Sequence, residues 1–327
     1  MNIRLAAIGA GRLSSRRIYP NLHLLPLELL AVCDLDRGLA SSMASRFGAK
    51  AVYTDHKRML EEMRPDAVII CTGPEGHEKL AIDAMEAGAH AYTEKPPAVT
   101  YAGAKAVQET ARRTGLICMT GFKKRFAPAY VKSKAAIDSA EFGKLNLLSI
   151  DYAAGPTYDN DPTNPTKQFL LDFCVHILDL SRYLAGEVAS VYAITTDHLN
   201  YAVNLRFEGG AIGTVALSSN RDWAVSTEKV EITGGPGQFI SVENSISMVR
   251  HSGAIIADWH SPNHSISAGD SMVETGFAGE LEEFCNAINE KRTPRSSISE
   301  SMGTLKLYEM IMASTKSGQV IDAKSFA

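Results

Sequence analysis

Two short groups of ionisable side chains in this chain could move a proton or hold a polar substrate. The first is Glu94-Lys95-Pro96, which follows the apolar, strand-like run 90–93, and its proline ends that strand. A lysine in such a turn can donate a hydrogen bond to a hydroxyl or carbonyl oxygen, or act as a base where burial favours its neutral form. Taken alone, Lys95 is more simply interpreted as a surface residue. Its role therefore has to be inferred from the other motifs of the sequence.

The second group lies in the run 169–184, which is apolar nearly all round and therefore predicts a buried helix. Asp172, His176 and Asp179 interrupt it at spacings of four and three, which would place them on one stripe. Buried charged groups are costly unless they are paired or functional, and a carboxylate beside a histidine can hold one ring nitrogen while the other takes a proton. We predict catalytic roles for Asp172 and His176 over a satisfied core histidine, whereas Asp179 fits a structural role equally well.

A glycine loop near the start of the chain predicts the element that positions Lys95. The short apolar strand 3–8 runs directly into Gly9-Ala10-Gly11-Arg12-Leu13-Ser14 and then into a helix start. In a dinucleotide-binding turn the first glycine allows the tight bend and the second lets the backbone approach a pyrophosphate. The third position needs a small residue, and Ser14 satisfies it.

An acidic residue at the end of the next strand strengthens this interpretation. Asp34 closes the apolar run 29–34, about 20 residues past the loop, where an NAD ribose would be hydrogen-bonded. A carboxylate there repels the 2′-phosphate of NADP, so the sequence favours NAD. Arg37 is close enough in the sequence to weaken that preference.

The remaining pattern of the first 120 residues alternates strands with helices. Apolar strands at 67–71 and 116–119 flank a helix predicted over 75–87, which Gly88 would cap. This alternation predicts a doubly wound parallel sheet with its ligand at the carboxyl edge. The loop Thr72-Gly73-Pro74 would face the cofactor, and His77, in the first turn of the helix, would support the site from behind.

From residue 122 the pattern changes to a helix, a strand at 145–152, the buried helix, and then many strands broken by turns. The predicted fold class is α/β: a Rossmann domain over residues 1–121, then an α+β domain over 122–327. The second domain should contain a large, mainly antiparallel open sheet with the buried helix on one face. The C-terminal helix can pack back on the first domain.

Polar and aromatic residues of the second half are candidates for substrate contacts. The loop 153–167 would hang over the active site and offers Tyr158, Asp159 and Asn164 as sugar ligands. Trp223 and His260 could line the pocket, or could equally be packing or interface residues.

These motifs together resemble the Gfo/Idh/MocA oxidoreductases over the whole chain. The resemblance is carried by the glycine loop, by Ala31-Val32-Cys33-Asp34, by the block 66–72 with His77, and by 87–90 leading into Glu94-Lys95-Pro96. It implies that Lys95 lies beside the nicotinamide and the substrate, and that Asp172 and His176 form the pair found in members that oxidise sugars and inositols. It also implies that subunits pair sheet to sheet, as a homodimer or homotetramer.

The chain departs from the family pattern at two places. Gly121-Phe122-Lys123-Lys124-Arg125-Phe126 has lysines where the family commonly has asparagine and its first arginine, so contacts from those two positions are in doubt. Many relatives have glycines just before the aspartate, whereas this chain has 168–171 as Gln-Phe-Leu-Leu, which should reshape the pocket.

Composition narrows the class of protein. The 327 residues suggest about two domains, and the net charge of -4 gives no basic footprint for nucleic acid or an anionic membrane. The five cysteines are scattered and predict neither disulfides nor a metal site. With no long apolar run and no signal peptide, we expect a cytoplasmic enzyme.

The sequence therefore predicts an NAD(P)-dependent dehydrogenase that oxidises a secondary alcohol of a sugar, sugar derivative or cyclitol. His176 would remove the hydroxyl proton, Asp172 would orient it, and Lys95 would stabilise the developing oxygen, although His176 and Lys95 could exchange roles. The predicted cofactor residues are Gly9, Gly11, Arg12, Leu13, Asp34, Arg37, Cys71, Thr72, His77, Glu94 and Lys95, and the predicted substrate residues are Lys95, Tyr158, Asp172 and His176.

Two other functions are compatible with the resemblance. One is redox-neutral elimination or hydrolysis of a glycosidic substituent, with NAD held tightly and no net NADH formed. The other is a non-enzymatic sensor of dinucleotide or sugar, which would not need Lys95, Asp172 and His176 together.

Overall fold

The computed structural model describes residues 2–156, 158, 161, 164, 168–222, 227–261 and 272–326. The chain divides into two compact units. The first consists of Met1–Phe122 with Phe277–Leu305, and the second of Lys123–Gly276 with Lys306–Ala327. The segment that follows the large sheet in sequence thus contributes to both units.

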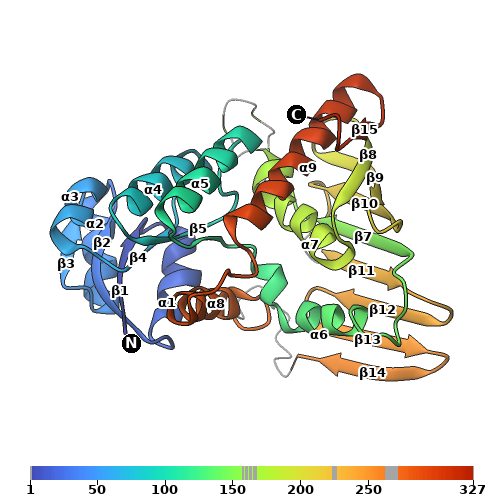
Figure 1. The fold of residues 1–327 in the computed structure, drawn as a ribbon, viewed down its shortest axis with the longest axis horizontal. Coiled ribbons are helices and arrows are strands. Elements are labelled where there is room, and N and C mark those ends of the chain that lie inside the picture. Colours follow the sequence, from blue (N-terminus) through green and yellow to red (C-terminus); the bar gives the residue numbers. More distant parts are fainter. Residues whose placement is uncertain are drawn as a thin grey trace. The chain divides into compact units, whose positions relative to one another are not determined.

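A six-stranded parallel sheet forms the centre of the first unit, in the order β3-β2-β1-β4-β5-β6 (Figure 1). Because helices cover both faces, the central strand β4 is a continuous apolar run that is buried along its whole length. The predicted doubly wound sheet is confirmed. Its strands are β1 Ile3–Ile8, β2 Leu27–Cys33, β3 Ala51–Tyr53, β4 Ala67–Ile70, β5 His90–Thr93 and β6 Cys118–Thr120.

Helices of the first unit begin and end at recognisable capping residues. Asp36, Asp55 and Thr100 accept backbone N–H groups at three helix starts, and Gly48 and Gly115 end two helices in the left-handed conformation. The helices are η1 Ser14–Ile18 and α1 Tyr19–Leu22, α2 Arg37–Phe47, α3 His56–Met63, α4 Pro74–Glu86, α5 Tyr101–Thr114 and α8 Phe277–Glu290.

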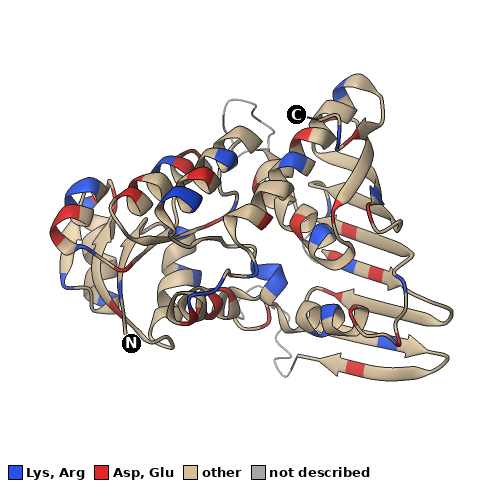
Figure 2. Ribbon diagram, in the orientation of Figure 1, with Lys and Arg blue, Asp and Glu red and all other residues tan. Residues whose placement is uncertain are grey.

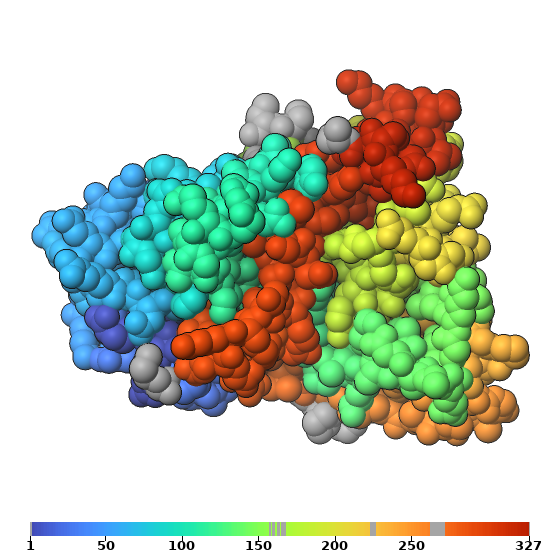
Figure 3. All heavy atoms as spheres, in the orientation of Figure 1, coloured from blue at the N-terminus to red at the C-terminus, as the bar shows by residue number. Residues whose placement is uncertain are grey.

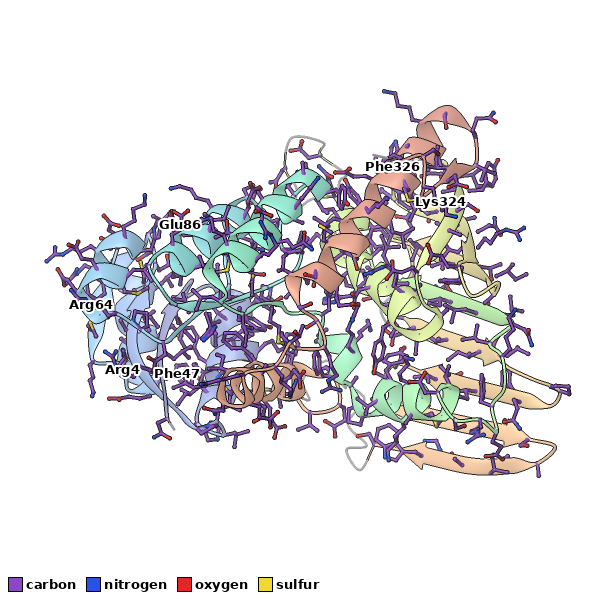
Figure 4. The ribbon with its side chains drawn as sticks, viewed as in Figure 1. Arg4, Phe47, Arg64, Glu86, Lys324 and Phe326 are labelled. Atoms are coloured by element: carbon purple, nitrogen blue, oxygen red, sulfur yellow. The ribbon has the colours of Figure 1, made fainter. Side chains whose placement is uncertain are left out.

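Segments far apart in the sequence meet on this unit. The amide of Gln108 in α5 donates to the Ser299 hydroxyl at 3.2 Å, and the orange segment 277–305 lies against the cyan-to-green helices in Figure 3. The side chain of Arg4 in β1 donates to the carbonyls of Met63 and Arg64 at the end of α3, and Figure 4 labels Arg4 and Arg64. These contacts join segments that are far apart in the sequence into one compact unit.

The second unit is built on a nine-stranded sheet in the order β14-β13-β12-β11-β7-β10-β9-β8-β15. Every pair is antiparallel except β7 and β10, so the predicted mainly antiparallel sheet is confirmed. Its strands are β7 Leu147–Ala153, β8 Val188–Thr195, β9 Asn200–Phe207, β10 Ile212–Ser218, β11 Glu228–Thr233, β12 Gln238–Glu243, β13 Ser247–Ser252, β14 Ile255–His260 and β15 Ile321–Asp322.

Two helices cover one face of this sheet. α7 Val175–Ala185, the predicted buried helix, packs on β7, and α6 Pro128–Ile137 packs on β12 and β13 (Figure 1). Along β9 and β10 buried residues alternate with exposed ones, as expected for a sheet with one open face. The long helix α9 Ile298–Ser317 begins in the first unit and ends in the second.

Charge is mixed over the chain. Figure 2 shows acidic and basic residues interspersed on the helices of both units. Within the part of the chain that the structure describes, no helix is both long enough and apolar enough to cross a membrane.

Candidate active site

The glycine loop at the carboxyl end of β1 is shaped by close backbone approach. Gly9 has a φ of 103°, and a Cβ there would lie well under 3.0 Å from the Cys71 carbonyl oxygen. The hydroxyl of Tyr19 donates to the Gly9 carbonyl at 3.0 Å, and its ring stacks on Phe47, labelled in Figure 4, at 5.3 Å. A Cβ on Gly11 would instead meet nothing within 4 Å. The loop therefore presents open backbone, which a dinucleotide pyrophosphate requires.

A cavity of about 650 Å³ adjoins this loop. Its volume is in the range of cofactor sites. Seven of the predicted cofactor residues line it: Gly9, Gly11, Arg12, Leu13, Asp34, Cys71 and Thr72. Residues that the sequence interpretation missed also line it, among them Thr54, His56, Glu75 and Lys79. Thr54 and His56 follow β3, and Glu75 and Lys79 lie in the first two turns of α4, so their place at the cavity depends on where the fold brings these two elements.

Asp34 is held facing the glycine loop. Its Oδ2 accepts the Ala10 N–H at 2.7 Å, and its Oδ1 accepts the Asp36 N–H at 2.9 Å. The carboxylate is therefore fixed at the cavity wall with lone pairs that a ribose hydroxyl could use. Arg37 is exposed at the first position of α2 and is not among the cavity residues.

The turn that carries Lys95 is held in place by two buried side chains, His77 and Glu94. The peptide bond between Lys95 and Pro96 is cis. His77 is fully buried, and its Nδ1 lies 2.7 Å from the Pro96 carbonyl oxygen, which makes Nδ1 the protonated nitrogen in this contact. Glu94 is buried too, and one of its oxygens accepts the Lys95 N–H at 3.2 Å. His77 thus supports the turn, as its predicted place behind the site suggested.

In the second unit, Asp172 lies in a π-helical turn, η4 Phe169–Phe173, which precedes α7. The Cys174 N–H donates to the Phe169 carbonyl, five residues back, at 3.0 Å. The prediction of one regular α-helix over 169–184 is therefore wrong at its first turn, because the wider turn shifts Asp172 out of the 3.6-residue stripe. Asp172 is half-buried, and His176 in α7 is 7% exposed.

Tyr158 is placed on Asp172. Its hydroxyl donates to Asp172 Oδ2 at 2.8 Å, and its ring contacts those of Phe169 and Phe173, with centroids 5.4 and 6.0 Å away. Burial, followed by the Asp172 charge, raises the pKa of Tyr158 far above its usual value, so the phenol remains a neutral donor. Tyr158, one of the predicted substrate residues, is therefore hydrogen-bonded to Asp172, another of them.

Asp179 is engaged by a cation. Arg125, in η2 Lys123–Phe126, donates to both Asp179 oxygens, at 2.7 and 2.8 Å, and both side chains are almost fully buried. This bidentate ion pair holds η2 against α7. Of the two roles considered for Asp179, the structure shows the structural one.

The lysine that replaces the first family arginine is also buried. Lys124 pairs with Glu228 on β11, which further accepts the hydroxyls of Tyr130 and, at 2.8 Å, Ser245. Burial raises the pKa of Glu228, but Lys124 and these hydroxyls outweigh it and lower the pKa below its usual value. Lys124 therefore acts as a buried counterion, which the motif could not show.

Of the other residues predicted to contact substrate, two are described by the structure and two are not. His260 ends the edge strand β14, is 61% exposed in its side chain, and pairs with Asp258 at 2.8 Å. The Asn164 N–H donates to the Asp161 carbonyl at 3.2 Å. Asp159 and Trp223 lie outside the described residues.

Within the described ranges, no group of three or more His, Cys, Asp or Glu side chains could hold a metal ion. All five cysteines are buried and reduced, and burial raises the pKa of the Cys118 thiol to about 12, which makes it unreactive.

Comparison with protein families matches nearly the whole chain. A model described as "Oxidoreductase family, NAD-binding Rossmann fold" matches residues 3–122, and one described as "Oxidoreductase family, C-terminal alpha/beta domain" matches residues 134–322. Both belong to the Gfo/Idh/MocA set.

Individual proteins resemble the chain over most of its length. It is 28% identical to the scyllo-inositol 2-dehydrogenase (NAD(+)) of Bacillus subtilis over 89% of this chain and 88% of that protein. It is 27% identical to the 4-carboxy-2-hydroxymuconate-6-semialdehyde dehydrogenase of a Sphingobium strain, over 90% and 93%. The fold matches levoglucosan dehydrogenase, solved with NADH and L-sorbose, with a TM-score of 0.86 at 21% identity over 99% of both chains.

Proposed function

The chain belongs to the Gfo/Idh/MocA family of oxidoreductases, and on this premise we propose that it is an NAD-dependent dehydrogenase which oxidises a secondary alcohol of a sugar, sugar derivative or cyclitol. The observation that carries the proposal is the cavity of about 650 Å³ at the glycine loop, with Asp34 fixed at its wall. Relatives named as inositol dehydrogenases support the substrate class.

The residues present fit NAD. Gly11 leaves open space beside the loop, where a pyrophosphate would approach. Asp34 would accept a ribose hydroxyl, and its charge would oppose a 2′-phosphate, which supports NAD over NADP. When bound, the nicotinamide supplies the hydride acceptor.

We assign the remaining steps to three side chains. Lys95 would donate a hydrogen bond to the substrate oxygen as it becomes a carbonyl. His176 would take the hydroxyl proton, with Asp172 orienting it, and Tyr158 would hold Asp172 in place until a substrate hydroxyl competes for the same oxygen. His176 could instead serve as the donor and Lys95 as the base, in which case the two variants below would differ in their pH dependence.

Assembly through the open face of the large sheet belongs to the same proposal, as a homodimer or homotetramer. That face exposes apolar side chains on β8 and β10, the two strands that flank β9: Ile194 is 54% exposed and Ile212 51%. Burial of exposed apolar side chains is energetically favourable, and in the proposed assembly a second copy of the chain would bury them.

The test is absorbance at 340 nm with NAD or NADP against inositols, aldoses, sugar acids and a carboxylated hydroxy acid, the last because the Sphingobium relative carries such a name. We expect the wild type to form NADH with one polyol class. The rate of NADH formation should be lower by about two or more orders of magnitude in Lys95→Ala and in His176→Ala. Lys50→Ala, whose side chain is 67% exposed and which is in none of the predicted sites, is the matched surface control. Full activity in both variants would contradict the assignment, and turnover without NADH would favour the redox-neutral reaction.

A further inference from the structure

The peptide group that joins Gly9 to Ala10, at the start of the glycine loop, is held by two side chains. The Tyr19 hydroxyl donates to the Gly9 carbonyl oxygen at 3.0 Å, and the Asp34 carboxylate accepts the Ala10 N–H at 2.7 Å. We propose that Tyr19 is a positioning residue for NAD, on which it acts by fixing this peptide together with Asp34. The inference rests on the proposed function, because it presumes that NAD binds at the glycine loop.

The two hydrogen bonds restrain a single rigid group. A peptide group is planar, and in its trans form the C=O and the N–H point to opposite sides. Tyr19 and Asp34 therefore hold it from opposite sides, and a rotation of the peptide would break both hydrogen bonds together. Such a restraint matters here because Gly9, with a φ of 103°, has backbone freedom that other residues lack.

The next carbonyl of the loop is held in a different way. The Gly11 carbonyl accepts the Ser14 hydroxyl and the Ser15 N–H, both at 3.0 Å, so the start of the following helix satisfies it. The Gly9 carbonyl instead takes its donor from Tyr19, ten residues along the chain. Because η1 is π-helical, the Tyr19 N–H donates to the Ser14 carbonyl, five residues back, and this wider turn sets where the Tyr19 side chain leaves the helix.

Packing alone does not account for a tyrosine at this position. Tyr19 is 1% exposed, and its ring stacks on that of Phe47, labelled in Figure 4, with 21° between the two planes. A phenylalanine would make the same stack without placing a hydroxyl in the interior, where an unbonded hydroxyl is costly. The hydroxyl is therefore explained by the Gly9 carbonyl that it binds.

The direction of the two hydrogen bonds is also fixed. Burial raises the pKa of Tyr19 far above its usual value, and Cys71, Asp34 and Cys33 raise it further, so the phenol keeps its proton and donates. The Asp34 carboxylate can only accept. A reversed peptide would turn its carbonyl oxygen toward that carboxylate, which is unfavourable, so the pair selects one orientation of the peptide.

Both parts of the proposed NAD site adjoin this peptide. Asp34 would accept a ribose hydroxyl, and Gly11 borders the space proposed for the pyrophosphate; both line the cavity of about 650 Å³. Tyr19 is not among the residues that line it, so it would act on NAD only through the loop. Without the Tyr19 hydroxyl, NAD would have to order the loop as it binds, and its affinity would fall.

The experiment is a fluorescence titration of the full-length protein with NAD. Tyr19→Phe removes the hydroxyl and keeps the ring, and we expect the Kd for NAD to rise about five- to tenfold. Phe47→Leu keeps the hydroxyl but removes the ring on which Tyr19 stacks, so it should raise the Kd by less. Thermal unfolding would show that each variant is folded, and Phe47→Leu decides the matter if Tyr19→Phe does not fold.

Kinetics separate positioning from loss of stability. With the substrate found in the 340 nm assay, Tyr19→Phe should raise the KM for NAD and leave kcat close to that of the wild type. Destabilisation alone would lower the amount of active enzyme, and hence the apparent kcat, without changing that KM.

Tyr130→Phe is the matched control. Tyr130 lies on α6 in the second unit, is 0% exposed and donates its hydroxyl to Glu228. This variant also loses one buried hydrogen bond, so its unfolding temperature should fall, but its Kd for NAD should equal that of the wild type. Wild-type affinity in a folded Tyr19→Phe, or an equal rise of the Kd in Tyr130→Phe, would overturn the inference.

Asp34→Ala distinguishes a failure of the proposed function. It removes both the acceptor of the Ala10 N–H and the acceptor proposed for the ribose, so the Kd for NAD should rise by about tenfold or more. Wild-type affinity in Asp34→Ala would overturn the proposed placement of NAD. Weakened binding in Asp34→Ala together with wild-type binding in Tyr19→Phe would overturn only the role of Tyr19.

Discussion

The glycine loop of the first unit and the Asp172–His176 segment of the second are held in place by opposite means. The loop is fixed by local backbone geometry, in which Gly9 fits because nothing larger can stand against the Cys71 carbonyl. The segment is fixed by side chains from distant parts of the chain, above all the Arg125–Asp179 pair and the Tyr158–Asp172 hydrogen bond.

The difference follows from what each region would have to present in the proposed function. A site for a dinucleotide needs open backbone, and glycine spacing encodes that within a few residues. A site that moves protons needs charged side chains at low exposure, and each of those requires a partner. The second region should therefore depend on long-range pairs, and the first should tolerate changes that spare its backbone.

Breaking the buried ion pair should give the largest effect. Arg125→Met removes the guanidinium that binds both oxygens of the buried Asp179 carboxylate, and we expect the free energy of unfolding to fall by about 3–5 kcal/mol, measured by urea denaturation. The double variant Arg125→Met/Asp179→Leu removes both charges and should recover much of that loss. A fall of under about 1 kcal/mol in the single variant would show that the pair does not hold this region together.

The two glycines of the loop provide a test of intermediate size. Gly9→Ala forces a side chain against the Cys71 carbonyl at a φ of 103° and should lower the unfolding free energy by about 1–3 kcal/mol. Gly11→Ala meets no neighbour within 4 Å, so its thermal unfolding should match the wild type.

NAD binding separates these variants further. Because Gly11 borders the space proposed for the pyrophosphate, Gly11→Ala should weaken NAD binding by roughly tenfold or more, measured by fluorescence titration. Wild-type affinity in this variant would remove the main support for the placement of the cofactor.

The smallest effect concerns acid stability in the second unit. The pKa of Glu228 lies below its ordinary value of 4.5, because Lys124 and two hydroxyls outweigh the effect of burial. The carboxylate therefore contributes its full stability above about pH 4.5, and this contribution is lost as the pH falls through the lower folded-state pKa.

We expect Glu228→Gln to weaken the fall in unfolding free energy that the wild type shows as the pH is lowered below about 4.5, measured by urea denaturation at several pH values. Glu231→Gln on the same strand, whose partner Lys229 is exposed, is the control and should leave that dependence unchanged. Equal slopes in the two variants would show that the Lys124 pair does not govern acid stability.

Motifs whose meaning is local could be predicted. The glycine loop, Asp34 at the end of β2 and the Glu94-Lys95-Pro96 turn all follow from short-range spacing, and the structure places the first two at one cavity. The alternation of strands and helices likewise gave the parallel sheet, because each period of the pattern is encoded within about ten residues.

Features that depend on partners far along the chain could not be predicted. Periodicity gave a regular helix over 169–184, whereas the structure begins it with a π-helical turn that displaces Asp172. The burial of Lys124 beside Glu228 joins residues 104 positions apart. Nothing in either local sequence signals that pairing.

By itself, the sequence determined the family, the two sheets and the side chains able to do the chemistry, because these depend on residue type and spacing. Only the tertiary structure decided which of those side chains are engaged by others: Asp179 by Arg125, Asp172 by Tyr158, and Glu94 by Tyr92. A charge buried in a protein must find its partner in space, and chain folding brings that partner from positions that spacing along the sequence does not reveal.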